Sequence, residues 1–288
     1  MNVGILTAGG VCPGVNNIIH TLTLYETSQG NQITGFNEGF RGLNNNTRIK
    51  LSRKKIEQGT AGSILRVSCD TVDLEKAREH IDDIDRLYCI CGNASMKSAK
   101  ELALDESVKA NIIGIPKTIF NDIHGLESIG FQTAVQEFAK YIDYAYTEAT
   151  TTNSIVFLEA PGKRDTGLAT NATYARYSKV TDVINKQTVN RISERQIKNN
   201  YEVNGYAVVV VGETSEYKDV LDFLKNEVDT EVKIMSPGFV IRDAEPCVYD
   251  TILSVRIARE AFEYAQKYRN FIKGAGTAIK FEDYLDIV

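Results

Sequence analysis

The sequence predicts an α/β fold made of doubly wound, parallel, Rossmann-like sheets. Short apolar runs alternate with amphipathic stretches along the chain, and most of these runs are continuously apolar. Three of the runs end in turns rich in Gly, Pro and small polar residues. A strand that is apolar on both sides is typical of a parallel sheet with helices covering both faces. We find no internal repeat and no low-complexity segment.

The expected elements follow from this periodicity. The segments expected to be strands are Val3–Thr7, Leu87–Cys91, Ile112–Ile115, Ser154–Leu158 and Tyr206–Val211. The segments with helical periodicity are Val15–Thr27, Ala94–Leu104, Thr133–Ala145, Ser215–Leu224 and Tyr249–Lys267. The polar stretch Thr147–Asn153 is the expected crossing between two domains.

Composition excludes several classes of protein. The 33 Lys and Arg residues are outnumbered by 38 Asp and Glu and form no basic block, so nucleic acid is not an expected partner. No apolar run approaches the ~20 residues that cross a bilayer, and the first residues lack the pattern of a signal peptide. The five cysteines are an odd number, which favours free thiols in a reducing compartment. We therefore expect a cytoplasmic protein that does not contact membranes.

Three turns contain the residues that could bind a ligand or take part in a reaction. Thr7–Gly14 follows the first expected strand, Gly92–Ser95 follows the second, and Ile115–Asp122 begins at the end of the third. The carboxyl ends of parallel strands line one crevice, where open α/β sheets bind their ligands. A glycine-rich turn before a helix presents backbone N–H groups to phosphate, although each turn alone also fits an ordinary tight connection.

The order of these motifs resembles the phosphofructokinase family, which transfers a phosphoryl group from ATP or pyrophosphate to fructose 6-phosphate. The segments that carry the resemblance are Thr7–Asn16 (TAGGVCPGVN), Glu38–Leu43 (EGFRGL), Ile90–Ser95 (ICGNAS), Ile115–Ile123 (IPKTIFNDI), Ile129–Ala134 (IGFQTA), Glu159–Lys163 (EAPGK), Gly238–Arg242 (GFVIR) and Tyr249–Arg256 (YDTILSVR). The resemblance implies the phosphofructokinase fold with a shortened C-terminus. It also implies a larger donor-side domain (1–132 plus 250–288) and a smaller sugar-phosphate-side domain (133–249).

The acidic positions of the family's active site are neutral in this chain. Phe120 stands at the general-base position and cannot accept a proton. Asn93 replaces the aspartate associated with magnesium, and Val11 replaces the aspartate of the first turn. On the nucleotide side Arg66 replaces a glycine and Cys69 an arginine. No metal site is therefore expected.

Other positions of the family's site are kept. Thr118 and Asp122 match the family and, with Lys163 in place of an arginine, are the candidate catalytic residues. The candidates for the phosphate-donor side are Gly10, Arg66, Gly92, Asn93, Ser95 and Lys117. The candidates for the sugar-phosphate side are Glu213, Lys233 and Arg242. Lys117 resembles a lysine of pyrophosphate users, but Ala94 is not their additional aspartate, so the donor stays open.

These residues lead to three hypotheses. The first is a catalytically impaired member of the family that binds a sugar phosphate or another phosphorylated small molecule, as a homo-oligomer or as a regulatory subunit of an active paralogue. The second is an active phosphotransferase whose base is another carboxylate, such as Asp122, and which transfers from ATP or pyrophosphate with Mg²⁺ to fructose 6-phosphate or a related acceptor. The third is a purely structural subunit.

Overall fold

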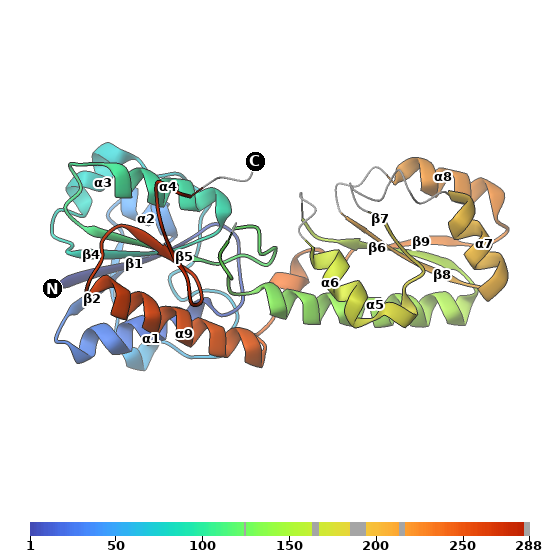
Figure 1. Ribbon diagram of the computed structural model, residues 1–288, viewed down its shortest axis with the longest axis horizontal. Helices are drawn as coiled ribbons and strands as arrows, with labels where there is room; N and C mark the ends of the chain where they lie inside the picture. Colours follow the sequence, from blue (N-terminus) through green and yellow to red (C-terminus); the bar gives the residue numbers. More distant parts are fainter. Residues whose placement is uncertain (124, 163–166, 185–193, 213–216, 285–288) are drawn as a thin grey trace. The chain divides into compact units, whose positions relative to one another are not determined.

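The computed structural model describes residues 1–123, 125–162, 167–184, 194–212 and 217–284 (Figure 1). The chain divides into two compact units. Unit 1 comprises Met1–Thr133 and Arg242–Val288, and unit 2 comprises Ala134–Ile241. None of the helices in the described ranges is long and apolar enough to cross a membrane.

Unit 1 is built on a sheet with the order β11-β10-β5-β4-β1-β2-β3. The strands are β1 (Asn2–Ala8), β2 (Gln32–Phe36), β3 (Arg48–Lys50), β4 (Arg86–Cys91), β5 (Asn111–Pro116), β10 (Phe271–Lys273) and β11 (Ala278–Lys280). The five inner strands are parallel, and the edge strands β3 and β11 pair antiparallel to their neighbours. Strands β4 and β5 are buried along their whole length, as expected for strands covered on both faces.

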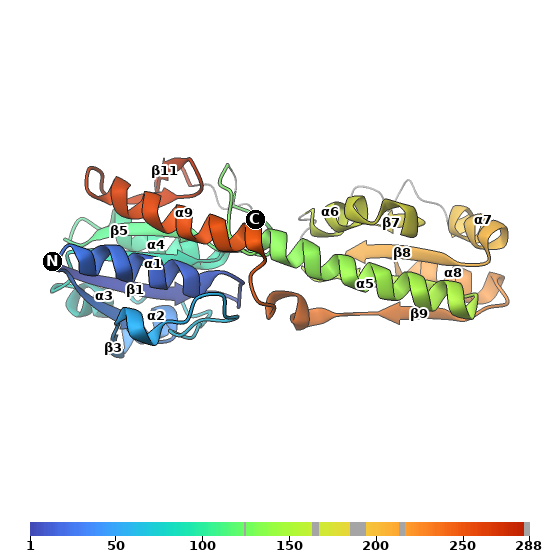
Figure 2. The ribbon, with the colours of Figure 1, turned by 90° about the horizontal axis from the view of Figure 1, so that it is seen from below.

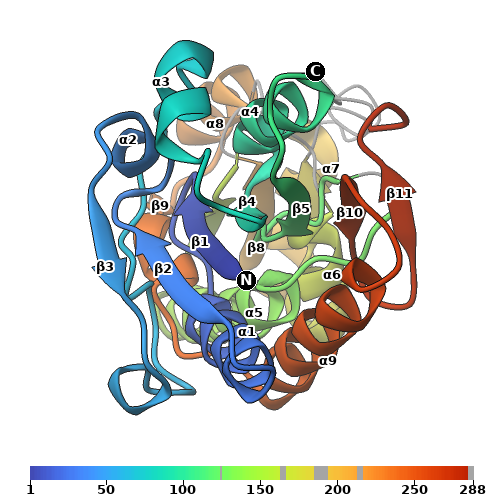
Figure 3. The ribbon, with the colours of Figure 1, turned by 90° about the vertical axis from the view of Figure 1, so that its left-hand side faces the viewer.

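Helices cover both faces of this sheet (Figure 3). On one face lie α1 (Val15–Ser28) and α9 (Val248–Ala265); on the other lie α2 (Gly39–Asn44), α3 (Leu74–His80) and α4 (Asn93–Leu104). A 3₁₀ turn, η1 (Arg53–Lys55), follows β3. The connection from β1 to β2, through α1, runs on one face of the sheet. The connection from β4 to β5, through α4, runs on the other face. The carboxyl ends of β1 and β4 therefore form the point where open α/β sheets place their crevice.

Unit 2 contains an all-parallel sheet with the order β7-β8-β6-β9 (Figure 2). The strands are β6 (Ile155–Ala160), β7 (Asp182–Ile184), β8 (Ala207–Gly212) and β9 (Val232–Met235). The helices are α5 (Phe131–Thr152), α6 (Leu168–Ala175), α7 (Glu194–Asn204) and α8 (Lys218–Glu227), with the 3₁₀ turns η2 (Tyr177–Lys179) and η3 (Gly238–Arg242). Alternate residues of β6 and β8 pack against α7 and α8 in one core, while α5 and α6 cover the opposite face.

A buried aspartate fixes the turn that precedes α5. Asp250, on the first turn of α9, is completely buried and accepts hydrogen bonds from the backbone N–H groups of Gly130 (3.0 Å) and Thr133 (2.7 Å). The Thr133 hydroxyl donates a third hydrogen bond at 2.5 Å. These bonds satisfy a buried carboxylate and connect the segment after β5 to α9.

The structure confirms the predicted α/β class with parallel sheets, and it extends several elements. The helix expected over Thr133–Ala145 continues to Thr152, so most of the stretch Thr147–Asn153 is its last turns and lies inside unit 2. The expectation of a domain crossing there is wrong, because polar threonines continue this helix on its exposed side. The chain passes between the units at 133/134 and 241/242, where the sequence analysis expected 132/133 and 249/250.

Candidate functional site

A cavity of about 300 Å³ lies where β1, β4 and β5 of unit 1 end. Residues from all three predicted turns line it, and segment Cys69–Thr71 and Arg242 complete the wall. The turns meet because their strands are adjacent: the Gly92 N–H donates to the Ala8 carbonyl (3.2 Å), and the Lys117 N–H donates to the Cys91 carbonyl (2.9 Å). The structure thus brings most of the predicted donor-side residues to one place, namely Gly10, Gly92, Asn93, Ser95 and Lys117.

Lys117 supplies a buried cation to this cavity. Its side chain is 2% exposed, and its Nζ donates a hydrogen bond to the Gly10 carbonyl at 2.5 Å. Loss of hydration lowers the pKa of the ammonium, an effect that the nearby thiols of Cys12 and Cys91 oppose. A cation that is buried this deeply is costly unless it has anionic or polar partners, so the position favours an anionic ligand.

Arg242 brings a second cation to the same wall. A Cβ atom placed on Gly10 would lie 3.3 Å from Nη1 of Arg242, so the guanidinium lies directly against the glycine turn. Gly9 has a φ of +92°, a left-handed conformation that glycine adopts readily. A Cβ atom placed on Gly9 would lie 3.5 Å from Nζ of Lys117, so a side chain at either glycine would contact one of the two cations.

Helix α4 begins at the cavity, and the N–H groups of its first turn have no partner within the helix itself. Its N-cap is Gly92, which has no side chain to accept a hydrogen bond, and its first turn contains no acidic residue. The N-terminus of a helix carries partial positive charge and unpaired backbone donors. The glycine turn, the helix start and the two cations are the groups that favour a phosphate or a similar anion in this cavity.

Thr118, Phe120 and Asp122 also line this cavity. The Thr118 hydroxyl donates to Oδ1 of Asp122 at 2.8 Å and accepts a hydrogen bond from the Phe120 N–H at 3.1 Å. These bonds hold the Asp122 carboxylate in the cavity wall. The side chain between Thr118 and Asp122, at the position where the resemblance implies the general base, is the Phe120 ring, which has no atom to accept a proton.

The residues of the cavity fit an anion better than a divalent cation. The Asp70 carboxylate that lines it accepts a hydrogen bond from Nε of Arg41 at 3.0 Å. The side-chain oxygen of Asn93 accepts a hydrogen bond from the hydroxyl of Tyr284. In the part of the chain that the structure describes, no group of three His, Cys, Asp or Glu side chains could hold a metal ion.

Arg66 lies outside this cavity. It borders a separate cavity of about 300 Å³ together with Gly62 and Ser63, and its side chain is 71% exposed with Nη1 3.4 Å from Glu38. Its backbone has a φ of +54°, so the residue adopts a left-handed conformation that glycine accommodates better.

The predicted sugar-phosphate residues fall in different units or outside the described residues. Lys233, near the start of β9 in unit 2, donates to Glu148 at 2.5 Å and lies 3.3 Å from Glu231. These carboxylates raise the pKa of the Lys233 ammonium and satisfy its charge. Arg242 belongs to unit 1, and Lys163 and Glu213 lie outside the described residues.

The structure adds two sites that sequence reasoning missed. Tyr284 contacts Asn93 through its hydroxyl, and no motif around Tyr284 predicts this contact. Glu159, at the end of β6, accepts hydrogen bonds from the hydroxyls of Tyr217 and Ser236. Its place in the EAPGK motif was the only available signal.

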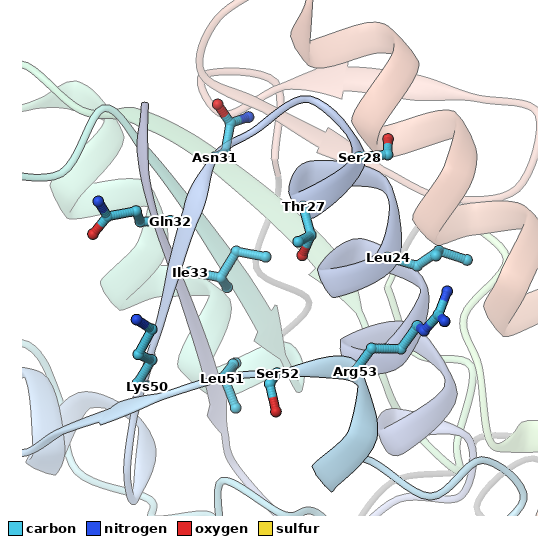
Figure 4. A pocket seen from close by; sticks show the side chains of 10 residues that line it. All are labelled: Leu24, Thr27, Ser28, Asn31, Gln32, Ile33, Lys50, Leu51, Ser52 and Arg53. Atoms are coloured by element: carbon cyan, nitrogen blue, oxygen red, sulfur yellow. The ribbon is translucent and has the colours of Figure 1, made fainter.

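A larger cavity of about 510 Å³ lies elsewhere in unit 1, between α1, the start of β2 and residues 50–53 (Figure 4). The side chains of Lys50 and Arg53 stand on its border, and Ile33 and Leu51 supply apolar surface. No residue of the predicted site lines this cavity.

Comparison with known proteins places this site in context. A family model described as phosphofructokinase matches residues 2–265. The ATP-dependent 6-phosphofructokinase of Sulfurihydrogenibium sp. is 28% identical over 94% of this chain and 88% of its own length. That of Chloroflexus aggregans is 25% identical over 99% of this chain and 89% of its own length.

Solved structures share the fold at lower identity. The pyrophosphate-dependent phosphofructokinase from Marinobacter aquaeolei is 17% identical, with a TM-score of 0.84 over 99% of this chain and 84% of its own. The phosphofructokinase from Saccharomyces cerevisiae is also 17% identical, with a TM-score of 0.84 over 98% of this chain and 44% of its own.

Proposed function

The chain belongs to the phosphofructokinase family, and we propose that it keeps the family's ability to bind a phosphorylated small molecule while its phosphotransfer chemistry is impaired. The observation that carries the proposal is the combination of two features in one cavity. Lys117 and Arg242 flank the glycine turn beside the start of α4, which favours a phosphate group. Phe120 stands where the family's general base would act.

The chemistry of the replaced positions supports impairment. A general base contributes about 10²–10⁴ to the rate of a proton-coupled step, and Phe120 supplies none of it. Asn93 is neutral, and its side-chain oxygen already accepts the Tyr284 hydroxyl, so it is a weak ligand for a hard cation. Binding through cations and backbone N–H groups needs neither position.

The ligand class follows from the same groups and from the relatives. The sequence relatives are named as ATP-dependent 6-phosphofructokinases, and a solved structure with the same fold is named as a pyrophosphate-dependent phosphofructokinase. A sugar phosphate, ATP or pyrophosphate could place its phosphate on the glycine turn. Assembly as a homo-oligomer or with an active paralogue, and a cytoplasmic location, are parts of the proposal that need their own tests.

A calorimetric titration with pyrophosphate, ATP, fructose 6-phosphate and inorganic phosphate tests binding without presupposing catalysis. Thermal unfolding with the same panel is the second measurement, because a ligand at 100 times its Kd stabilises the native state by about 2.7 kcal/mol. We expect at least one phosphorylated compound to bind. If none binds at millimolar concentration, the proposal fails and a purely structural subunit becomes the better account.

One observation favours an active phosphotransferase instead. Asp122 is a carboxylate in the cavity wall, and the Thr118 hydroxyl holds it at 2.8 Å. If the chain turns over with Mg²⁺ and ATP or pyrophosphate, the variant Asp122→Asn should abolish that turnover. The control Asp70→Asn should not, because Arg41 already engages this second carboxylate of the cavity.

A further inference from the structure

The last described residues of the chain pack against the helix that begins at the cavity. Phe281 is completely buried and Tyr284 is 3% exposed. Both belong to the core cluster of unit 1 that also contains Met96 and Ala99 of α4. The segment Phe281–Tyr284, here the C-terminal segment, is therefore an integral part of the core next to α4.

Hydrogen bonds fix Tyr284 to α4 at two points. Its hydroxyl donates to Asn93, where it contacts both the backbone carbonyl at 2.9 Å and the side-chain oxygen. Its own carbonyl accepts a hydrogen bond from Nζ of Lys100, almost two turns further along α4, at 2.9 Å. These contacts tie the first residue of α4 to the C-terminal segment.

The first turn of α4 depends on such external support. Gly92 offers no side-chain cap, so no local contact from the N-cap fixes the start of the helix. Asn93 lines the cavity and is 8% exposed, whereas Tyr284 does not line the cavity. The effect of the Tyr284 hydroxyl on a ligand would therefore act through Asn93, the residue that it contacts.

We infer that Tyr284 is a positioning residue of the phosphate cavity: its hydroxyl holds Asn93 so that the first turn of α4 presents its N–H groups to the ligand. This inference rests on the proposed phosphate-binding function. The aromatic ring fills the core, and a phenylalanine would fill the same space. The positioning role belongs to the hydroxyl alone, which makes it separable from packing.

The test compares Tyr284→Phe with the matched control Tyr88→Phe. Tyr88 is completely buried in the same unit, and its hydroxyl donates to Glu26 at 2.7 Å, away from the cavity. Both variants lose one buried tyrosine hydroxyl. Titrated with pyrophosphate, Tyr284→Phe should bind about threefold to tenfold more weakly than the wild type, the loss expected from one hydrogen bond. Tyr88→Phe should bind like the wild type. Equal affinities in wild type and Tyr284→Phe would overturn the inference.

Hydrogen exchange without any ligand separates this inference from the proposed function. Relative to the amides of β5, those of residues 96–99 in α4 should exchange about threefold to tenfold faster in Tyr284→Phe than in the wild type. In Tyr88→Phe their exchange should be unchanged. Unchanged α4 exchange in Tyr284→Phe would also overturn the inference. If the wild type fails to bind pyrophosphate while α4 exchange responds, the binding function is wrong and the coupling of the C-terminal segment to α4 stands.

Discussion

Replacing Lys117 with methionine should separate binding from stability. The Lys117 ammonium is buried beside the glycine turn, and it donates a hydrogen bond to the Gly10 carbonyl. Methionine has a similar length and no charge. We expect Lys117→Met to lose affinity for phosphate compounds and, at the same time, to become more resistant to unfolding.

The two magnitudes follow from the surroundings of the ammonium. A hydrogen bond to a charged group is worth about 1.5–3 kcal/mol, so the affinity for pyrophosphate should fall about 10- to 150-fold. Burying an ammonium costs several kcal/mol, only part of which the Gly10 carbonyl returns. We expect a net gain of about 1–2 kcal/mol in the free energy of unfolding, or about 2–8 °C in Tm for a unit of this size.

The pH dependence of this gain has a definite sign. Burial lowers the pKa of Lys117 below its ordinary value of 10.5, so the unfolded chain binds this proton more tightly than the native one. The wild type should therefore regain stability as the pH rises through the lowered pKa toward 10.5. The advantage of Lys117→Met should shrink over the same range.

Lys273→Met is the matched control for this experiment. Lys273 is also a buried lysine of unit 1, at 5% exposure, but it pairs with Glu260 at 2.6 Å outside the cavity. Its replacement should cost about 1.5–3 kcal/mol of stability and leave pyrophosphate binding unchanged. Calorimetric titration and thermal unfolding of the wild type and both variants give the result. A wild-type affinity in Lys117→Met would refute the assignment of Lys117 as a ligand-binding cation.

Three further predictions follow from single contacts. Arg66→Gly should raise the free energy of unfolding by about 0.5–1 kcal/mol. Relief of the left-handed conformation contributes about 1–2 kcal/mol, and the greater flexibility of glycine in the unfolded chain offsets part of this gain. A lower Tm would contradict the prediction. Hydrogen bonds from Arg48 lower the pKa of Asp83 below its ordinary 3.8, so the stability that Asp83 adds is present above pH 3.8 and is lost as the pH falls through the lowered pKa. The stability difference between wild type and Asp83→Asn should therefore vanish in acid, and a constant difference from pH 7 to pH 2 would exclude this pair as its source. The double variant Phe120→Asp with Asn93→Asp should gain phosphotransfer from ATP or pyrophosphate to fructose 6-phosphate; loss of an existing activity would instead indicate a rewired site.

The sequence allowed prediction of the long, buried parts of the fold. Strands β4 and β5 are continuous apolar runs, and α9 repeats its apolar residues at helical spacing, so local pattern alone specifies them. The edge strands β3 and β11 were missed because each has only three residues and a partly exposed face. Their pairing depends on partners that are distant in the sequence.

The candidate site divides in the same way. The turns after β1, β4 and β5 were predictable because Gly, Pro or small polar residues follow directly on a recognisable apolar strand. The approach of Arg242 to Gly10 and of Tyr284 to Asn93 was not, since each joins residues that are far apart along the chain. The ion pair of Lys233 with Glu148 also needed the structure, because a motif position does not reveal which carboxylates surround it.

The turnover of the unmodified chain tests the account most directly. The assay contains Mg²⁺, saturating fructose 6-phosphate and either ATP or pyrophosphate, with coupled detection of the product. Loss of the general base should hold the rate about 10²–10⁴ below that of ordinary kinases, which turn over at about 1–100 s⁻¹. We therefore predict turnover of no more than about 1 s⁻¹ from a chain that still binds pyrophosphate or a sugar phosphate. Turnover clearly faster than about 1 s⁻¹ with either donor would contradict the account.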